Sequence, residues 1–143
     1  MPKAEKASYS ENIARLRAQS QTEPVASFLD MKLEELEPGY ARISARLKPE
    51  YRNFHGVVFG GIIMAVADEA FAYAVNSLNH PTVASQFNIH FLNAAEMEDG
   101  LIAEGRVLKM GRRAAVCEMT VSNTEGKLIA KASGTGIPLS GDR

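Results

Sequence analysis

Cysteine is nearly absent from this sequence, and neither sign of charge is in clear excess. Cys117 is the single cysteine among 143 residues, and the formal net charge at pH 7 is −1. One cysteine excludes an internal disulfide framework and is typical of a protein in a reducing cytoplasm. A balanced charge gives no electrostatic reason to bind nucleic acid or a membrane surface. We therefore expect a cytoplasmic protein with no nucleic-acid or membrane partner.

Long apolar runs and several short enzyme motifs are also missing. The most apolar stretch, Ile62–Val75, is shorter than the roughly 18–20 residues that span a bilayer, and Met1–Lys6 lacks the apolar segment of a signal peptide. The sequence has no G-x-S-x-G nucleophile motif and no P-loop. His55, His80 and His90 are scattered, without the spacing of metal ligands. We expect no metal and no cofactor.

Turn residues divide the chain into a short series of expected helices and strands. The polar residues 1–9 are expected to be frayed, Ser10 to cap a short helix, and Thr22-Glu23-Pro24 to start a second helical turn. Asn79-His80-Pro81 is expected to stop the long apolar helix. Alternating segments predict strands. The expected helices are Ser10–Ala18 and Gly60–Leu78, and the expected strands are Leu29–Glu37, Tyr40–Leu47, Thr82–Leu92, Leu101–Met110, Arg113–Ser122 and Lys127–Ile137.

The segment Gly60–Leu78 is apolar on almost all sides, and this decides the expected fold class. A helix of this kind must be surrounded by other elements. The simplest arrangement of the available strands is a curved antiparallel β-sheet wrapped around this one long central helix, an α+β fold. We expect a single domain over residues 1–143, with residues 1–27 as a helical or flexible N-terminal segment.

The stretch Asn53–Gly61, followed by Asp68, is the part of the sequence that indicates a site. Glycines at a helix start let another group approach the backbone, and the free N–H groups there favour an anion or a carbonyl oxygen. A lone acid in an apolar helix is costly unless something uses or satisfies it. The pattern therefore predicts a site with a polarising end and a carboxylate.

The same stretch resembles the hotdog-fold acyl-CoA thioesterases of the phenylacetate-degradation (PaaI) type. That family reads roughly N-x-H-G-x-x-H-G-G, then an apolar run, then A-D-x-A-F-A-Y-A-x-N-S. The resemblance extends over about residues 28–137, and one position departs from it, because Phe59 stands where the family has its second histidine. The matching residues here are Asn53, His55, Gly56, Gly60, Gly61, Ala67, Asp68, Ala70, Phe71, Ala72, Tyr73, Ala74, Asn76 and Ser77.

The spacing of Gly61 and Asp68 suggests that two subunits share the site. These residues are seven positions apart. At ~100° and 1.5 Å per residue they lie on one helix face about 10 Å apart, too far for one thioester carbonyl to contact both within one chain. The resemblance likewise implies a site at a homodimer interface, within an expected homotetramer. It assigns the backbone N–H of Gly60 or Gly61 to polarise the thioester oxygen, and Asp68 of the facing subunit to act as nucleophile or as general base.

Four further side chains near this motif have alternative interpretations. Asn53 either orients a water molecule or orders its loop, and the alternative is an ordinary turn residue. Ser85, in the matching segment Val-Ala-Ser, either bonds Asp68 or the substrate or is an ordinary strand hydroxyl. His55 is expected to be structural. Glu69 is rotated by ~100° from Asp68 and is expected to point to another subunit or to solvent, without a catalytic role.

Substrate binding is expected at two places. Phe59 offers apolar area beside the helix start in place of a polar ring. The basic turn Lys109-Met110-Gly111-Arg112-Arg113 is placed by the resemblance next to the CoA nucleotide, where Lys109, Arg112 or Arg113 would pair with a phosphate around Gly111. A solvated turn with exposed cations is the alternative.

We consider three functions. The leading one is hydrolysis of an aryl-acyl or medium-chain acyl-CoA to the free acid and CoA. Aromatic surface for an aryl group could come from Phe71, Tyr73 and Phe91, although ordinary core packing explains all three equally well. The second is a non-catalytic acyl-CoA-binding hotdog protein, which Phe59 favours and the retained Asp68 opposes. The third is a hotdog dehydratase, which needs a histidine with an acid, and no suitably placed histidine stands near Asp68.

Overall fold

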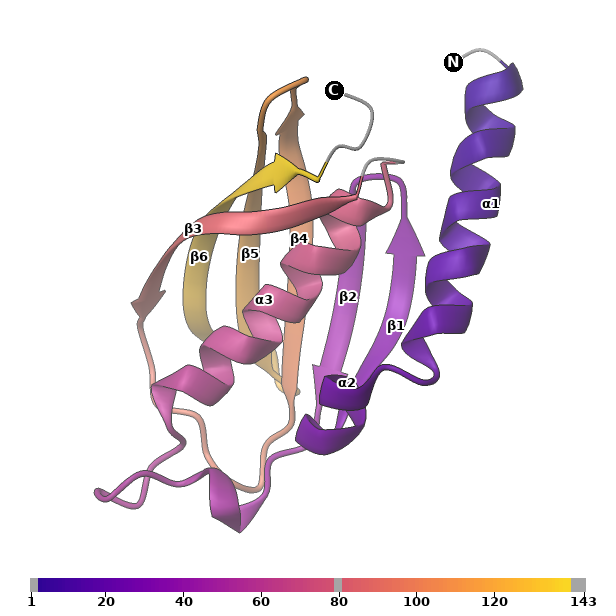
Figure 1. Ribbon diagram of the computed structural model, residues 1–143. Helices are drawn as coiled ribbons and strands as arrows, with labels where there is room; N and C mark the ends of the chain where they lie inside the picture. Colours follow the sequence, from indigo (N-terminus) through magenta and orange to yellow (C-terminus); the bar gives the residue numbers. More distant parts are fainter. Residues whose placement is uncertain (1–2, 79–80, 140–143) are drawn as a thin grey trace.

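The computed structural model describes residues 3–78 and 81–139, and it shows a six-stranded sheet curved around one long helix (Figure 1). The strands follow the order β1-β2-β4-β5-β6-β3, and every neighbouring pair is antiparallel. The expected α+β arrangement is therefore confirmed. The elements are α1 (Lys3–Ser20), α2 (Pro24–Leu29), β1 (Met31–Glu37), β2 (Tyr40–Ala45), the 3-10 turn η1 (Pro49–Tyr51), α3 (Gly60–Asn76), β3 (Thr82–Phe91), β4 (Leu101–Met110), β5 (Ala115–Asn123) and β6 (Leu128–Pro138).

Helix α3 is held on the concave face of the sheet by apolar packing. Its residues Val66, Phe71 and Val75 are almost fully buried, and they belong to one core with inward-facing strand residues such as Ile43 and Met119. Each such side chain contributes roughly 1.5–3 kcal/mol when it leaves water. The alternating burial along β5 places every second residue toward this core, as a strand with one covered face requires.

Glycines in the sheet allow the helix to lie close to it. A Cβ at Gly105 in β4 would lie 2.7 Å from the carbonyl oxygen of Ala70, a backbone atom that cannot move cheaply. A Cβ at Gly134 in β6 would lie 3.0 Å from the ring of Phe71. Any larger residue at Gly105 would push α3 off the sheet.

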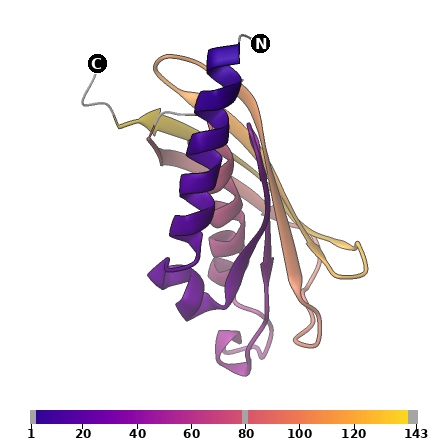
Figure 2. The same ribbon diagram turned by 90° about the vertical axis from the view of Figure 1, so that its right-hand side faces the viewer.

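The two edges of the sheet differ in how they are covered. Helix α1 runs beside β1 at one edge (Figures 1 and 2), where Arg17 donates a hydrogen bond to the carbonyl of Leu36 and Asn12 donates one to the carbonyl of Asn76 at the end of α3. Strand β3 forms the other edge, and after Thr82 its side chains are exposed or half-buried. No other described strand of the chain pairs with this second edge.

Several expected boundaries are wrong near the N-terminus. Helix α1 begins at Lys3 rather than at Ser10, so Ser10 lies inside the helix and does not cap it. Strand β1 begins at Met31 because Asp30, with φ 56°, is the left-handed C-cap of α2. The expected helix stop at Asn79 and His80 lies outside the described residues.

The later strands also begin or end within a few residues of the expected positions. Strand β2 ends at Ala45, and β5 begins at Ala115 because the N–H of Gly111 donates to the carbonyl of Ala114 and closes a turn there. The pairing of β2 with β4 is regular, whereas each of the other four strand pairs contains a shift in register.

Candidate active site

The loop before α3 is ordered by the side chain of Asn53. Its Oδ1 accepts hydrogen bonds from the backbone N–H of His55 (2.9 Å) and of Val57 (3.3 Å). The backbone N–H of Asn53 also donates to the carbonyl of Val57 (2.8 Å), and Gly56 turns the chain at φ 81°. Of the two roles considered for Asn53, these contacts show the ordering of the loop. His55 is exposed, and its ring packs against Phe54 at 4.2 Å between centroids.

Two backbone N–H groups at the start of α3 are free. The N–H of Phe59 donates to the carbonyl of Tyr51, and the N–H of Ile62 donates to the carbonyl of Phe59 (2.9 Å). Within residues 3–78 and 81–139, the N–H groups of Gly60 and Gly61 donate no hydrogen bond. Unpaired N–H groups at a helix start carry the positive end of the helix dipole. They can therefore polarise a carbonyl oxygen.

Two aromatic rings pack against these glycines. A Cβ at Gly61 would lie 2.6 Å from Cε1 of Phe59, and a Cβ at Gly60 would lie 3.1 Å from Cζ of Phe91. Both rings are about half exposed, at 55% for Phe59 and 52% for Phe91. Phe59 therefore lies beside the helix start, as expected from its place before the paired glycines. The contact of Phe91 with the helix start was not predicted, because its place at the end of a strand says nothing about the helix start.

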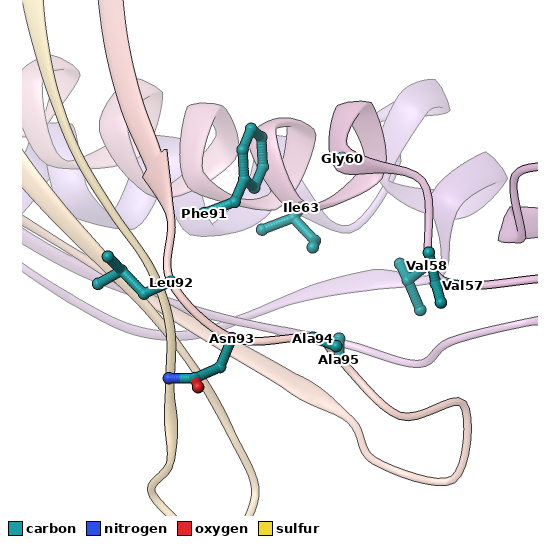
Figure 3. A pocket seen from close by; sticks show the side chains of 9 residues that line it. All are labelled: Val57, Val58, Gly60, Ile63, Phe91, Leu92, Asn93, Ala94 and Ala95. Carbon is teal, nitrogen blue, oxygen red and sulfur yellow. The ribbon is translucent and has the colours of Figure 1, made fainter. Parts of the chain in front are cut away.

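An apolar cavity of about 350 Å³ opens beside Gly60. Figure 3 shows its walls, which come from the loop before α3, the first turn of α3 and the segment after β3. The amide of Asn93 points away from the cavity and donates to the carbonyl of Leu128 (2.8 Å). The lining residues are Val57, Val58, Gly60, Ile63, Phe91, Leu92, Asn93, Ala94 and Ala95, and none of them is charged.

Asp68 lies two turns further along α3 on an exposed part of the helix. Partial burial against the surrounding surface raises the pKa of its carboxyl above the ordinary value. No described residue donates a hydrogen bond to this carboxyl. The helix from Gly60 onward keeps Asp68 and the free N–H groups about 10 Å apart, as the spacing predicted. One chain therefore does not bring the two ends of the expected site together.

Glu69 is buried within the chain. The expectation that it points to another subunit or to solvent is therefore wrong. Its side chain is only 8% exposed. Burial raises the pKa of Glu69 to about 9. A hydrogen bond with Glu23 and the negative charge of Glu23 act in the same direction. The hydroxyl of Tyr73 donates to Oε1 of the same Glu23 at 2.6 Å. Glu23 lies just before α2, and no spacing in the sequence links it to Glu69.

Ser85 and the basic turn lie away from these groups in one chain. The Ser85 hydroxyl donates to the carbonyl of Thr135 (3.2 Å) rather than to Asp68. The turn that contains Lys109, Arg112 and Arg113 joins β4 to β5 at the end of the sheet opposite to the start of α3 (Figure 1). The length of β4 separates the two ends by roughly 30 Å.

Neither a metal site nor a membrane-spanning helix is found in the described part of the chain. No group of three or more histidine, cysteine, aspartate or glutamate side chains lies close enough there to hold a metal ion. None of the helices described is both long and apolar enough to cross a membrane.

The fold is a curved antiparallel sheet around a central helix, with free N–H groups at the helix start. Similarity to known proteins identifies the class of protein to which this fold belongs. The family model described as "Thioesterase superfamily" matches residues 55–130. A putative esterase of Archaeoglobus fulgidus is 38% identical over 75% of this chain and 70% of its own length. The acyl-coenzyme A thioesterase PaaI of Escherichia coli is 28% identical over 87% of this chain and 89% of its own length.

A solved structure agrees with these relatives. The structure of the Escherichia coli PaaI protein from the phenylacetic acid degradation operon matches with a TM-score of 0.86 and 27% identity, over 94% of this chain and 96% of that one. The chain therefore belongs to the thioesterase superfamily and has the hotdog fold of the PaaI type. The expected family, fold and thioester-hydrolase class are confirmed.

Proposed function

We propose that this protein hydrolyses an aryl-acyl or medium-chain acyl-CoA to the free carboxylic acid and CoA. The observation that carries the proposal is the pair of free N–H groups at Gly60 and Gly61, which open beside an uncharged cavity. Support comes from the Escherichia coli relative, which is named an acyl-coenzyme A thioesterase. No cofactor enters the reaction, since CoA is part of the substrate and the product.

The proposed reaction uses the free N–H groups at the helix start and the carboxylate of Asp68. It proceeds either by direct attack of water or through a covalent intermediate. The thioester oxygen accepts hydrogen bonds from Gly60 and Gly61, which stabilise the negative charge that develops on it. Asp68 either takes a proton from the attacking water or attacks the carbonyl carbon itself, and water then hydrolyses the anhydride. In both cases the C–S bond breaks and the CoA thiolate leaves and takes up a proton. The raised pKa of Asp68 makes it a stronger base than an ordinary aspartate.

We propose that a second copy of the chain supplies Asp68 to each site. Strand β3 presents unpaired backbone groups at an open edge, and exposed edges of this kind favour pairing with another strand. Met64 of α3 and Val83 and Phe91 of β3 also expose apolar side chains. Antiparallel pairing of two β3 strands about a two-fold axis would produce a homodimer, and two homodimers would form the expected homotetramer.

The same pairing gives the basic turn its proposed role in binding CoA. An antiparallel partner places its own β4–β5 turn at the end of the sheet where this chain begins α3. Lys109, Arg112 and Arg113 of the second copy could then pair with CoA phosphates, around the turn that Gly111 allows. All three cations are exposed, and within the described residues none of them forms an ion pair.

The second candidate function is binding of acyl-CoA without hydrolysis. One observation favours it: the ring of Phe59 lies over Gly61, where the family pattern has a histidine. Two measurements on purified protein distinguish these candidate functions: binding of an acyl-CoA and release of thiol from the same acyl-CoA. We expect thiol release from a panel of acyl-CoAs, whereas micromolar binding of the same acyl-CoA without thiol release would overturn the enzymatic proposal.

Mixing two inactive variants tests the shared site. Asp68→Ala removes the carboxylate, and Gly60→Val places a side chain against Phe91 at the helix start. A mixed dimer retains one intact pairing of Gly60 with Asp68, so we expect activity to return after subunit exchange. No recovery despite proven exchange would favour a site within one chain.

A further inference from the structure

The cavity beside Gly60 has a size and a chemistry that identify the part of the substrate it would hold. Its volume is about 350 Å³. An apolar cavity of about 150 Å³ is enough to hold benzene. The cavity can therefore accommodate an aromatic ring with a short linker, or a chain of several methylene groups. It opens at the residue whose free N–H is proposed to polarise the thioester oxygen, so a group attached to that carbonyl reaches it directly.

The wall opposite the helix is fixed by backbone hydrogen bonds. The N–H groups of Leu92 (2.8 Å) and Asn93 (3.2 Å) both donate to the carbonyl of Ile129 in the chain just after the start of β6. Ala95 is only 6% exposed and belongs to the hydrophobic core. A wall held in this way does not retreat easily from a larger group, so its side chains can limit what enters.

The charge around the cavity opposes a negatively charged acyl group. No lining residue is charged, and the only polar side chain among them, Asn93, is turned away and bonded to Leu128. The loop that follows carries Glu96, Glu98 and Asp99. A carboxylate placed in the cavity would lose its water without gaining a hydrogen-bonding partner. The acids of the loop would also repel it.

From this geometry we infer that the cavity binds the uncharged acyl group of the substrate, and that Ala95 and Phe91 set the size of that group. This inference rests on the proposed thioester hydrolysis. Ala95 lines the cavity with the smallest possible side chain, and the ring of Phe91 forms the wall next to Gly60. Neither residue belongs to the stretch Asn53–Ser77 that carries the family motif.

The experiment measures kcat/KM for acetyl-, butyryl-, succinyl-, octanoyl- and phenylacetyl-CoA. Butyryl and succinyl groups have the same number of carbons, and succinyl carries a carboxylate at its end. We expect the wild-type protein to prefer butyryl- over succinyl-CoA by about 100-fold or more, because the carboxylate would be buried unpaired. Equal rates for this pair would overturn the assignment of the cavity to the acyl group.

Two variants test the residues that set the size. Ala95→Leu fills part of the cavity, so we expect kcat/KM for octanoyl- and phenylacetyl-CoA to fall by about 10-fold or more, with acetyl-CoA within about three-fold of wild type. Phe91→Ala enlarges the cavity, and we expect the ratio of octanoyl- to acetyl-CoA to rise by about 10-fold. Because Phe91 is half exposed, this variant decides the question if Ala95→Leu does not fold.

A matched control separates this inference from the proposed function. Ala18→Leu makes the same change on an exposed position of α1 and should leave the substrate profile unchanged. If the wild-type protein hydrolyses no acyl-CoA, the proposed function fails. If it hydrolyses them but Ala95→Leu and Phe91→Ala keep the wild-type order of substrates, or lower all substrates equally, the inference about the cavity fails alone.

Discussion

Asp68 and Glu69 are adjacent acids on one helix, and the structure places them in opposite surroundings. Asp68 lies on the open flank of α3, where its side chain is exposed and no described residue donates to its carboxyl. Glu69 lies on the flank covered by α1 and α2, where Glu23 and Tyr73 form a hydrogen-bonded group with it. The two flanks differ because neighbouring helical residues point about 100° apart.

The different surroundings indicate different roles for Asp68 and Glu69. On the closed flank the chain itself surrounds the carboxyl group, because burial and the neighbouring Glu23 raise the pKa of Glu69 and favour its protonated form. On the open flank the carboxyl is left for a group outside the chain. An acid that is satisfied internally serves to join α2 to α3, whereas an unsatisfied acid beside a site is available for chemistry.

Removing the carboxylate of the open flank should have the largest effect on activity. We expect Asp68→Asn to lower thioester turnover by about 100-fold or more, the scale expected for loss of a general base or nucleophile. Stability should change by less than about 0.5 kcal/mol, because Asn fills nearly the same volume and Asp68 has no partner to lose. Glu69→Gln, the matched change one residue away, should keep most of the turnover. A variant Asp68→Asn with more than about a third of wild-type turnover would remove Asp68 from the mechanism.

The closed flank should instead determine how stability depends on pH. Burial and the neighbouring Glu23 raise the pKa of Glu69 from the ordinary 4.5 to about 9, so we expect the folded protein to keep this group protonated where an unfolded chain releases its proton. The wild-type protein should therefore lose stability as the pH rises through this window, by about 2 kcal/mol once relaxation around the buried group is allowed for. Glu69→Gln cannot ionise, so its stability should fall less over the same range.

Thermal unfolding of both proteins at several pH values between 5 and 9 measures this difference. Glu125→Gln changes an exposed glutamate in the β5–β6 turn and should follow the wild-type curve. Parallel curves for wild type and Glu69→Gln would show that Glu69 is ionised in the folded protein.

Loss of the Tyr73 hydroxyl should destabilise the protein moderately. Tyr73→Phe removes the hydrogen bond to Glu23 without opening a large cavity, and a bond to a charged acceptor contributes about 1.5 kcal/mol or somewhat more. Denaturant unfolding at pH 7 would measure the change, with Tyr40→Phe, which loses a similar bond to Glu104 far from α2, as the comparison. Turnover per folded molecule should stay close to wild type, since Tyr73 lies on the closed flank.

The smallest effect is expected at the helix start. If the backbone N–H groups of Gly60 and Gly61 polarise the substrate, the side chain before them need not be polar. Phe59→His should then change turnover by less than about three-fold. A gain of about 100-fold would show that wild-type Phe59 has largely abolished catalysis and would favour the binding protein.

Much of the site could be predicted because its signals are local. The paired glycines and the apolar run after Phe59 fix where α3 starts, and a helix of known rise fixes the distance from Gly61 to Asp68. The contact of Phe91 with Gly60 and the burial of Glu69 could not be predicted, since both depend on segments distant in the sequence. Phe91 meets Gly60 only because β3 ends beside the helix start.

The sequence by itself determined the type of the longer helices and strands, the central position of the apolar helix and the position of the free N–H groups. These follow from hydrophobic periodicity and from glycine at a helix start. Only the tertiary structure decided which of two adjacent acids is buried, and it put the basic turn of Arg112 at the far end of the sheet from Gly60. These outcomes depend on where α2 packs and on how the strands are ordered across the sheet. Such contacts join residues far apart in the chain, and no local pattern records them.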